Sequence, residues 1–232
     1  MEKLFRNVEE NLKRIRGGIA EAEQESGRAA GSVRLMAVTK TVEPAAINEA
    51  IRLGVDILGE NKAQELLQKS PDYLPAEIHF IGHLQTNKVS KIIDKVSLVQ
   101  SVDRLPLAEE ISRQAVKIGK IMPVLIEVNI GGEQSKSGCQ PEKLQELATG
   151  IAELPGITVK GLMTIPPFCD EIRLTEQFFC RMQQLYVDIK AKKLDNVDMD
   201  ILSMGMSDDY PLAIRHGSNL VRIGSALFGR RG

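Results

Sequence analysis

Lys40 is the residue of this chain whose type and position best suit covalent chemistry. It directly follows the apolar run LMAVT at residues 35–39. Burial disfavours the charged form of a lysine, so a lysine at the end of a buried run tends to present a neutral amine. A neutral amine can condense with an aldehyde to form a Schiff base. The alternative is a lysine that ends a strand and simply reaches into solvent.

Two segments near the C-terminus could hold an anion. The segments LSMGMSDD and VRIGSALFG each combine glycine with serine. Glycine lets backbone N–H groups approach an anion closely, and serine hydroxyls add further donors. The segments therefore predict a phosphate-type site formed by Ser203, Gly205, Ser207, Gly224 and Ser225.

Two further polar residues could contact a bound molecule. Arg222 lies within the apolar run NLVRIG, where an unpaired guanidinium would be costly, so it needs a ring nitrogen, a carboxylate or a phosphate as acceptor. A structural ion pair is the alternative for Arg222. Asn61 follows a predicted strand and could hydrogen-bond a ligand, although asparagine is also common as a turn residue or helix cap.

Other reactive side chains give weaker signals, and no catalytic residue is assigned. His83 has no evident partner, so a packed or capping role is the simpler interpretation. The loop Gly131–Gly138 (GGEQSKSG) has glycine, lysine and serine but lacks the order of a Walker motif. Cys139, Cys169 and Cys180 are odd in number and lack C-x-x-C spacing, which favours reduced thiols and predicts neither disulfides nor a metal site.

The elements that must position these residues alternate between strand and helix. Short apolar runs predict eight strands: Val33–Thr39, Ile57–Leu58, Ile78–Ile81, Leu98–Val99, Val124–Val128, Val159–Met163, Ile201–Met204 and Leu220–Ile223. Helical spacing predicts helices between them: Glu43–Leu53, Lys62–Lys69, Asn87–Asp94, Arg104–Ile118, Pro141–Leu154 and Glu171–Ala191. Eight such units indicate an α/β protein with a closed (β/α)8 TIM barrel; a doubly wound open sheet is the competing arrangement.

An additional helix is expected before the first strand. An apolar stripe with intervals of three or four predicts a helix within residues 1–28 that packs on the barrel, and residues 1–232 are expected to form one domain. Only a few residues follow the eighth strand, so the N-terminal helix is free to cover that face. Barrel closure places strand eight beside strand one, so Lys40 and the anion-binding turns should share one rim.

Composition limits the classes of partner. The 232 residues carry 30 basic and 31 acidic side chains, a net charge of −1, so neither nucleic acid nor an anionic membrane surface is an expected partner. The N-terminus lacks the uninterrupted apolar stretch of a signal peptide or membrane span. A cytoplasmic protein is expected.

Seven segments together resemble a known family. They are AVTK, GENKAQE, HFIGHLQTNK, LIEVNIGGEQSKSG, GLMTIPP, LSMGMSDD and VRIGSALFG, in that order from about Val33 to Gly229. The chain resembles the pyridoxal phosphate homeostasis protein family (YggS/PROSC type), whose barrel is similar to the N-terminal domain of alanine racemase. The resemblance implies pyridoxal 5′-phosphate (PLP) held on Lys40, with phosphate contacts from the two glycine–serine turns, Met206 included. It also implies Arg222 at the pyridine nitrogen and Asn61 near the ring.

The resemblance also implies a function. An arginine at the pyridine nitrogen disfavours its protonation and weakens the ring as an electron sink. The implied function is buffering or delivery of PLP without robust turnover, by a monomer with PLP-dependent apoenzymes as transient partners. The alternative is a one-domain PLP-dependent amino-acid racemase, in which Lys40 and one further group move the α-proton. Of the tyrosines, only Tyr210 is expected at the barrel mouth.

Overall fold

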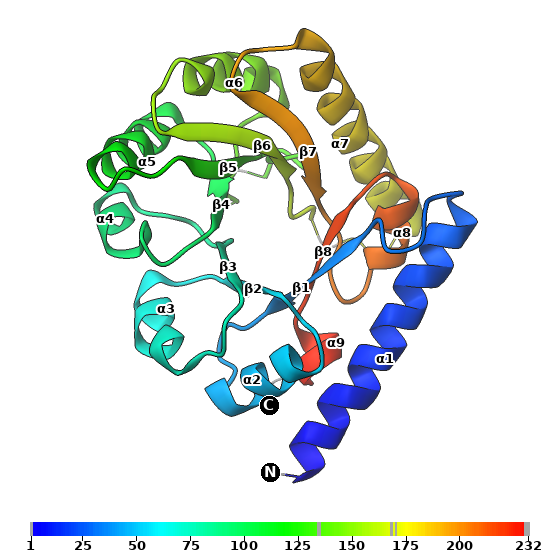
Figure 1. The fold of residues 1–232 in the computed structure, drawn as a ribbon. Helices are drawn as coiled ribbons and strands as arrows, with labels where there is room; N and C mark the ends of the chain where they lie inside the picture. Colours follow the sequence, from blue (N-terminus) through cyan, green and yellow to red (C-terminus); the bar gives the residue numbers. More distant parts are fainter. Residues whose placement is uncertain (1, 134–135, 168, 170, 230–232) are drawn as a thin grey trace.

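Eight parallel strands close into a barrel in the computed structural model of this chain (Figure 1). The structure describes residues 2–133, 136–167, 169 and 171–229. Each strand is hydrogen-bonded to its neighbours in sequence, and β1 also pairs with β8. This closure confirms the predicted (β/α)8 barrel and excludes the open sheet.

The strands occupy the positions predicted from apolar runs, with shifted ends. They are β1 (Arg34–Val38), β2 (Ile57–Glu60), β3 (Glu77–Phe80), β4 (Leu98–Val102), β5 (Met122–Glu127), β6 (Ile157–Met163), β7 (Val197–Ser203) and β8 (Leu220–Ile223). The largest shift is in β7, which begins four residues before the predicted Ile201. The segment before Ile201 alternates exposed aspartates with the buried Met199, a half-exposed strand that a search for continuous apolar runs misses.

Helices surround the barrel, as Figure 1 shows. The helices are α1 (Glu2–Glu25), α2 (Pro44–Arg52), α3 (Ala63–Lys69), α4 (Val89–Ile92), α5 (Leu105–Lys117), α6 (Leu144–Ala152), α7 (Ile172–Lys192), α8 (Tyr210–Arg215) and α9 (Ser225–Phe228). Short 3₁₀ turns lie at η1 (Ser70–Asp72), η2 (Thr86–Lys88) and η3 (Pro141–Lys143). The predicted helices 87–94 and 141–154 each begin as a 3₁₀ turn. Helix α8 was not predicted because six residues are too few to show a clear period.

The core is aliphatic, as the low aromatic content requires. Its largest cluster fills the interface between the barrel wall and the helices from α3 to α8. Phe80 and Phe179 are its fully buried phenylalanines. Arg222 is a fully buried large side chain as well, and this cation in the barrel interior needs compensating partners.

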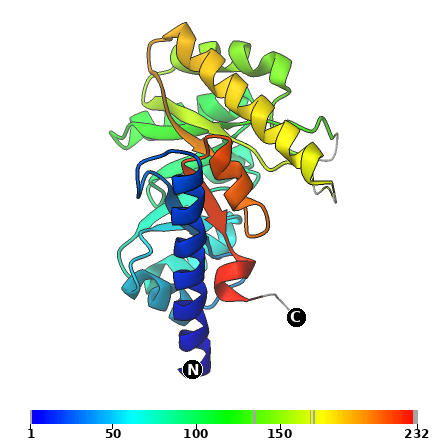
Figure 2. The same ribbon diagram turned by 90° about the vertical axis from the view of Figure 1, so that its right-hand side faces the viewer.

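Helix α1 covers the barrel beside β8 and β1. Its apolar stripe of Val8, Leu12, Ile15, Ile19 and Ala22 is buried. The helix lies alongside α8 and α9 in both views, with α2 also in contact (Figures 1 and 2). Because α9 has only four residues, α1 supplies the apolar cover that this part of the wall would otherwise lack.

Barrel closure brings the carboxyl ends of the strands to one rim. Ala37 of β1 pairs with Ile223 of β8, and Val38 pairs with Gly59 of β2. Lys40 and Asn61 each lie two residues beyond a paired position, and Gly224 lies one residue beyond. The strands therefore deliver the predicted site residues of β8, β1 and β2 to neighbouring places.

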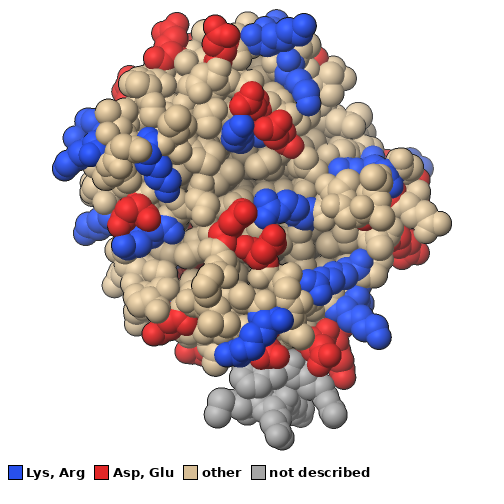
Figure 3. All heavy atoms as spheres, in the orientation of Figure 1, with Lys and Arg blue, Asp and Glu red and all other residues tan. Residues whose placement is uncertain are grey.

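Surface charge is mixed in sign. Figure 3 shows basic and acidic side chains interspersed over the face turned to the viewer, without a broad area of one sign. None of the helices in the described part of the chain combines the length and apolar character that a bilayer span needs.

Candidate functional site

Lys40 lies in a turn directly after β1 and is half-buried. The preceding residue, Thr39, extends the pairing with β2 because its N–H donates to the Gly59 carbonyl at 3.0 Å. The following residue, Thr41, has a φ of 59°, which L-residues other than glycine rarely adopt. The chain therefore bends sharply at the point where it presents Lys40.

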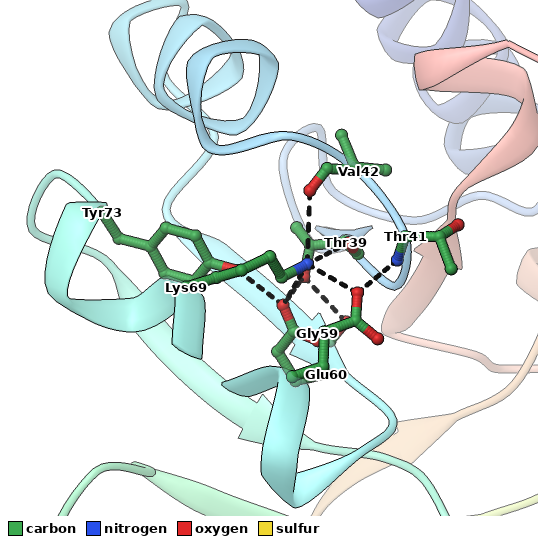
Figure 4. A network of polar contacts seen from close by, with 8 residues as sticks. Thr39, Thr41, Val42, Gly59, Glu60, Lys69 and Tyr73 are labelled. Carbon is green, nitrogen blue, oxygen red and sulfur yellow. Dashed lines mark hydrogen bonds and ion pairs between the residues drawn. The ribbon is translucent and has the colours of Figure 1, made fainter. Parts of the chain in front are cut away.

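An ammonium group behind this turn holds its backbone in place (Figure 4). Lys69 Nζ donates to the carbonyl oxygens of Thr39 at 2.8 Å and Val42 at 3.3 Å. The same atom lies 2.8 Å from Glu65 Oε1, which also accepts a hydrogen bond from the Thr41 amide. Burial raises the pKa of Glu65, but its bonds with Lys69 and Thr41 outweigh that effect and lower it overall.

The fully buried Glu60 is the second carboxylate of this cluster. Its Oε1 accepts hydrogen bonds from Thr39 Oγ1 and Tyr73 Oη, both at 2.6 Å, and lies 3.2 Å from Lys69 Nζ. Burial, together with the Glu60 carboxylate, raises the pKa of Tyr73, so its hydroxyl stays a donor. We call Thr39, Glu60, Glu65, Lys69 and Tyr73 the outer network, because these side chains gather around the backbone of residues 39–42, on the outer side of the barrel wall (Figure 4).

The turn after β7 is fixed by glycine and aspartate. Gly205 has a φ of 92°, which side-chain-bearing residues rarely adopt. A Cβ there would also lie 2.6 Å from the Ala213 side chain, so both the backbone conformation and the lack of space favour glycine. Asp209 Oδ1 accepts a hydrogen bond from the Met206 amide at 2.6 Å. The segment therefore holds one defined backbone shape at the rim.

The turns after β7 and β8 are joined to each other. Ser207 Oγ accepts a hydrogen bond from the Ala226 amide at 3.1 Å. Both Ser207 and Ser225 line a pocket of about 440 Å³, and Asn11 and Arg14 of α1 lie on its wall. Two of the predicted serines thus share one pocket. The cation of this pocket is Arg14 of α1, a helix that the sequence analysis did not connect with the site.

Gly224 lies against β1. A Cβ on Gly224 would lie 3.4 Å from Val38 Cβ and 3.5 Å from the Val38 carbonyl oxygen, two residues before Lys40. These are ordinary van der Waals distances, so the turn after β8 lies directly beside the strand that carries the lysine.

Arg222 projects into the barrel interior and is 2% exposed. Its Nη1 donates to Ser203 Oγ and its Nη2 to the Thr164 carbonyl, both at 2.7 Å. Burial lowers the pKa of Arg222 to about 10, and the carboxyl groups of Asp209 and Glu127 partly offset this effect. Hydrogen bonds to neutral oxygens therefore hold the guanidinium, and none of the described carboxylates forms an ion pair with it.

A line of hydrogen bonds continues from Arg222 across the barrel. Ser203 Oγ donates to Gln100 Oε1 at 2.8 Å, and Gln100 Nε2 lies 3.0 Å from His79 Nδ1. His79 Nε2 lies 3.4 Å from a carboxylate oxygen of Glu77 at the start of β3. We call Arg222, Ser203, Gln100, His79 and Glu77 the inner relay.

The ends of the inner relay fix its direction. An arginine only donates and an ionised carboxylate only accepts, so each member between them must accept from one side and donate to the other. Ser203 passes its single proton to the Gln100 oxygen, which turns the amide nitrogen toward His79 Nδ1. Burial lowers the pKa of His79 to about 4, so the ring is neutral near pH 7 with its proton on Nε2, facing Glu77.

The structure gives one of the predicted phosphate-binding residues partners within the protein. Ser203 was expected to donate to a bound phosphate, but its hydroxyl is fully buried and its proton is directed to Gln100. Of the three predicted serines, only Ser207 and Ser225 remain accessible to a ligand at the rim. Ser203 instead supports Arg222 from below.

Three other expectations concerned residues outside the predicted site. His83 does have partners, because its Nδ1 lies 3.2 Å from Ser137 Oγ and 3.8 Å from Asp103. Lys136 Nζ of the loop 131–138 donates to the Pro166 carbonyl at 3.2 Å; Gln134 and Ser135 of that loop lie outside the described residues. Tyr210 does not point into the barrel mouth, since its hydroxyl lies against Gly18 of α1.

Sequence reasoning missed the residues that support the site. Gln100 lies within the buried run LVQSV and His79 within EIHF, and a buried polar residue in an apolar strand was the available signal for both. Glu60 was visible in the same way. Lys69 gave no signal, because a lysine in the last turn of a helix usually extends into solvent.

Comparisons with known proteins agree with this geometry. The family described as alanine racemase, N-terminal domain, matches residues 11–232. A pyridoxal phosphate homeostasis protein of Aquifex aeolicus is 42% identical over 227 residues, covering 97% of this chain and 99% of the relative. An unknown protein from Bifidobacterium adolescentis superposes with a TM-score of 0.94 and 37% identity, over 98% of this chain and 96% of its own.

A third comparison is with a structure that holds a ligand. PipY of Synechococcus elongatus, solved with PLP bound, has a TM-score of 0.83 and 29% identity, over 96% of this chain and all of its own. The shared barrel, the identity above 40% and the nearly complete coverage lead to one assignment. This chain belongs to the pyridoxal phosphate homeostasis protein family, within the fold family of the alanine racemase N-terminal domain.

Proposed function

We propose that this chain binds PLP as a Schiff base on Lys40 and serves PLP homeostasis by buffering or delivering the cofactor. The observation that carries the proposal is the pairing of β1 with β8. It brings an amine at the end of one strand beside a glycine–serine turn at the end of the next. A small molecule that carries both an aldehyde and a phosphate ester, as PLP does, could use the amine and the turn together.

The residues present fit PLP in their chemistry. Asn61 Oδ1 is buried and has no hydrogen-bond partner among the described residues, so it can accept a hydrogen bond from a ligand hydroxyl. Gly224 lies beside Val38 and presents only backbone at the rim. The hydroxyl groups of Ser207 and Ser225 and the backbone of both turns supply donors for a phosphate.

Each group of the chain has a distinct task in this proposal. Lys40 supplies the amine, and the turns after β7 and β8, with Gly205, Met206 and Gly224, orient the phosphate. Arg222, held from below by Ser203, faces the ring nitrogen as a donor and disfavours a proton there. When bound, PLP supplies an aldehyde carbon and an electron-withdrawing ring, and Arg222 weakens the second property.

The tyrosines support a homeostasis role more than turnover. A racemase needs a second acid–base group opposite the lysine, and a tyrosine is a suitable type. Tyr73 donates to Glu60, Tyr186 hydrogen-bonds the Met199 carbonyl, and Tyr210 lies against α1. The hydroxyl groups of Tyr73 and Tyr186 are therefore committed elsewhere and that of Tyr210 faces α1, and the homeostasis proteins among the relatives favour the same role.

The remaining parts of the proposal concern the setting. Cys139, Cys169 and Cys180 are all free thiols, which suits a reducing compartment such as the cytoplasm. We place the protein there as a monomer, with PLP-dependent apoenzymes as transient recipients of the cofactor.

Reduction with borohydride tests the proposal directly. Protein saturated with PLP is expected to show a visible absorbance band that borohydride removes, with the added mass located on Lys40 by peptide mass spectrometry. Lys40→Ala should lack both signals, whereas Lys95→Ala, which removes an exposed lysine paired with Asp94, should retain them. An adduct of undiminished yield on another lysine in Lys40→Ala would contradict the assignment.

Two controls separate binding from turnover. Pyridoxal without its phosphate should be retained much more weakly than PLP, because it forfeits the charge-assisted hydrogen bonds of the two turns. Interconversion of L- and D-alanine by the saturated protein at rates well above free PLP would replace the homeostasis role with the racemase alternative.

A further inference from the structure

A second pocket opens at the same rim, on the side of β2 and β3. It has a volume of about 420 Å³ and lies between the segment after β2 and the segment after β3. Its polar wall consists of Lys62, Gln64, His83, Gln85, Lys88 and Lys91. We call it the lysine pocket. Segments that follow the carboxyl ends of barrel strands are the usual place for ligand sites in this fold.

The three lysines of this pocket lack direct carboxylate partners among the described residues. Lys62, Lys88 and Lys91 form no hydrogen bond or ion pair with any described residue, and no aspartate or glutamate is among the described residues that line the pocket. Lys69, by contrast, lies within hydrogen-bonding distance of two carboxylates. In a chain of nearly balanced charge, three cations around one hollow create a local positive potential that favours an anion.

The nearest acidic groups have other partners. Glu65 is within electrostatic reach of Lys62, but it binds Lys69 and the Thr41 amide. Asp103 approaches His83 at 3.8 Å, but its close contact is with Arg104. Neither carboxylate fills the lysine pocket, so the three positive charges remain available to a ligand.

The rest of the lining defines the class of ligand. Leu67, Phe80 and Leu84 add apolar surface to the lining of the same pocket. Lysine acts as a point charge toward phosphate, and a dianionic phosphate ester neutralises more of three positive charges than a carboxylate does. The apolar surface adds contact for a small organic group.

From these observations we propose that the lysine pocket binds the phosphate group of a small phosphate monoester, at a site separate from Lys40. The two sites share only Asn61; Lys40, Arg222, Ser207 and Ser225 are absent from the lining. The proposed PLP site accounts for neither Lys62, Lys88 nor Lys91. Binding at this second site therefore does not depend on formation of the Schiff base on Lys40.

Titration with inorganic phosphate, followed by two-dimensional amide NMR, tests the site. The titration is run on protein freed of ligands and again on protein saturated with PLP and reduced with borohydride. Saturable shifts are expected at the amides of residues 85–91 in both samples, at constant ionic strength maintained with chloride. If the chain takes up no PLP, the first titration still tests the lysine pocket.

Matched variants locate the binding. Lys88→Gln and Lys91→Gln should each weaken phosphate binding by about tenfold, the loss expected for one charge-assisted hydrogen bond. Lys95→Gln removes a nearby exposed lysine that is already paired with Asp94, and should weaken it less than about twofold. Equal loss in all three variants, shifts that do not saturate, or loss of the shifts on reduction with PLP would each overturn the proposal.

Discussion

The inner relay and the outer network stabilise the two halves of the candidate site by different physical means. The inner relay is a linear chain of contacts from Arg222 to Glu77, in which each member between the ends accepts from one neighbour and donates to the next. The outer network instead gathers several donors on two carboxylates around the ammonium of Lys69. Removing a member should therefore leave unpaired dipoles in the relay but an uncompensated charge in the network.

The largest effect is expected from breaking the outer network. Lys69→Met removes the cation beside Glu60, whose side chain has no exposed surface. An uncompensated buried carboxylate costs about 3–5 kcal/mol, so the free energy of unfolding should fall by about that amount in urea denaturation. Lys143→Met, which breaks an ion pair exposed on both sides, should change it little. Equal effects of the two variants would mean that the network does not compensate buried charge.

A smaller effect is expected from interrupting the inner relay. Gln100→Leu leaves the Ser203 hydroxyl without an acceptor for its proton and His79 Nδ1 without a donor in the barrel interior, although Ser203 Oγ still accepts from Arg222. The expected loss is about 1–3 kcal/mol of unfolding free energy. Because Ser203 also supports Arg222, the visible spectrum of PLP-saturated protein should shift in this variant, whereas Lys143→Met should leave it unchanged. If Gln100→Leu is as stable as the protein and its spectrum is unaltered, the relay supports neither the fold nor the PLP site.

The most specific effect is confined to acid pH and is absent near neutrality. In the folded chain burial lowers the pKa of His79 to about 4, whereas an unfolded histidine titrates near its ordinary value of 6.5. Between these values the unfolded state binds more protons, so acidification favours unfolding. The contribution of His79 is complete above pH 6.5 and is lost as the pH falls toward 4.

A variant isolates this contribution. The difference in unfolding free energy between the protein and His79→Phe should be constant above about pH 6.5 and should change progressively toward pH 4, in favour of the variant. Glu127, whose pKa burial raises to about 7, titrates in both chains and cancels in the difference. Nitrogen-15 NMR of His79 near pH 7 should show the proton on Nε2. A proton on Nδ1 would reverse the assigned direction of the relay.

Local patterns predicted much of the fold and the rim of the site. Both ends of strand β8 were predicted correctly, because its run of four residues is mostly apolar and is followed by a glycine. Lys40, Gly224 and Asn61 could be placed at one rim because strand order alone determines which carboxyl ends are neighbours. The partners of Ser203 could not be predicted, because an inward or outward orientation depends on a register that the apolar run does not specify.

The sequence by itself determined the alternation of strands and helices, the closed barrel and the strands that end in Lys40 and the glycine–serine turns. Those properties follow from the period and composition of short segments. Only the tertiary structure decided that Ser203 meets Gln100, 103 residues away in the chain, and that Lys69 turns inward to Glu60. Buried polar groups need partners, but the sequence does not state which partner a closed barrel brings within hydrogen-bond distance.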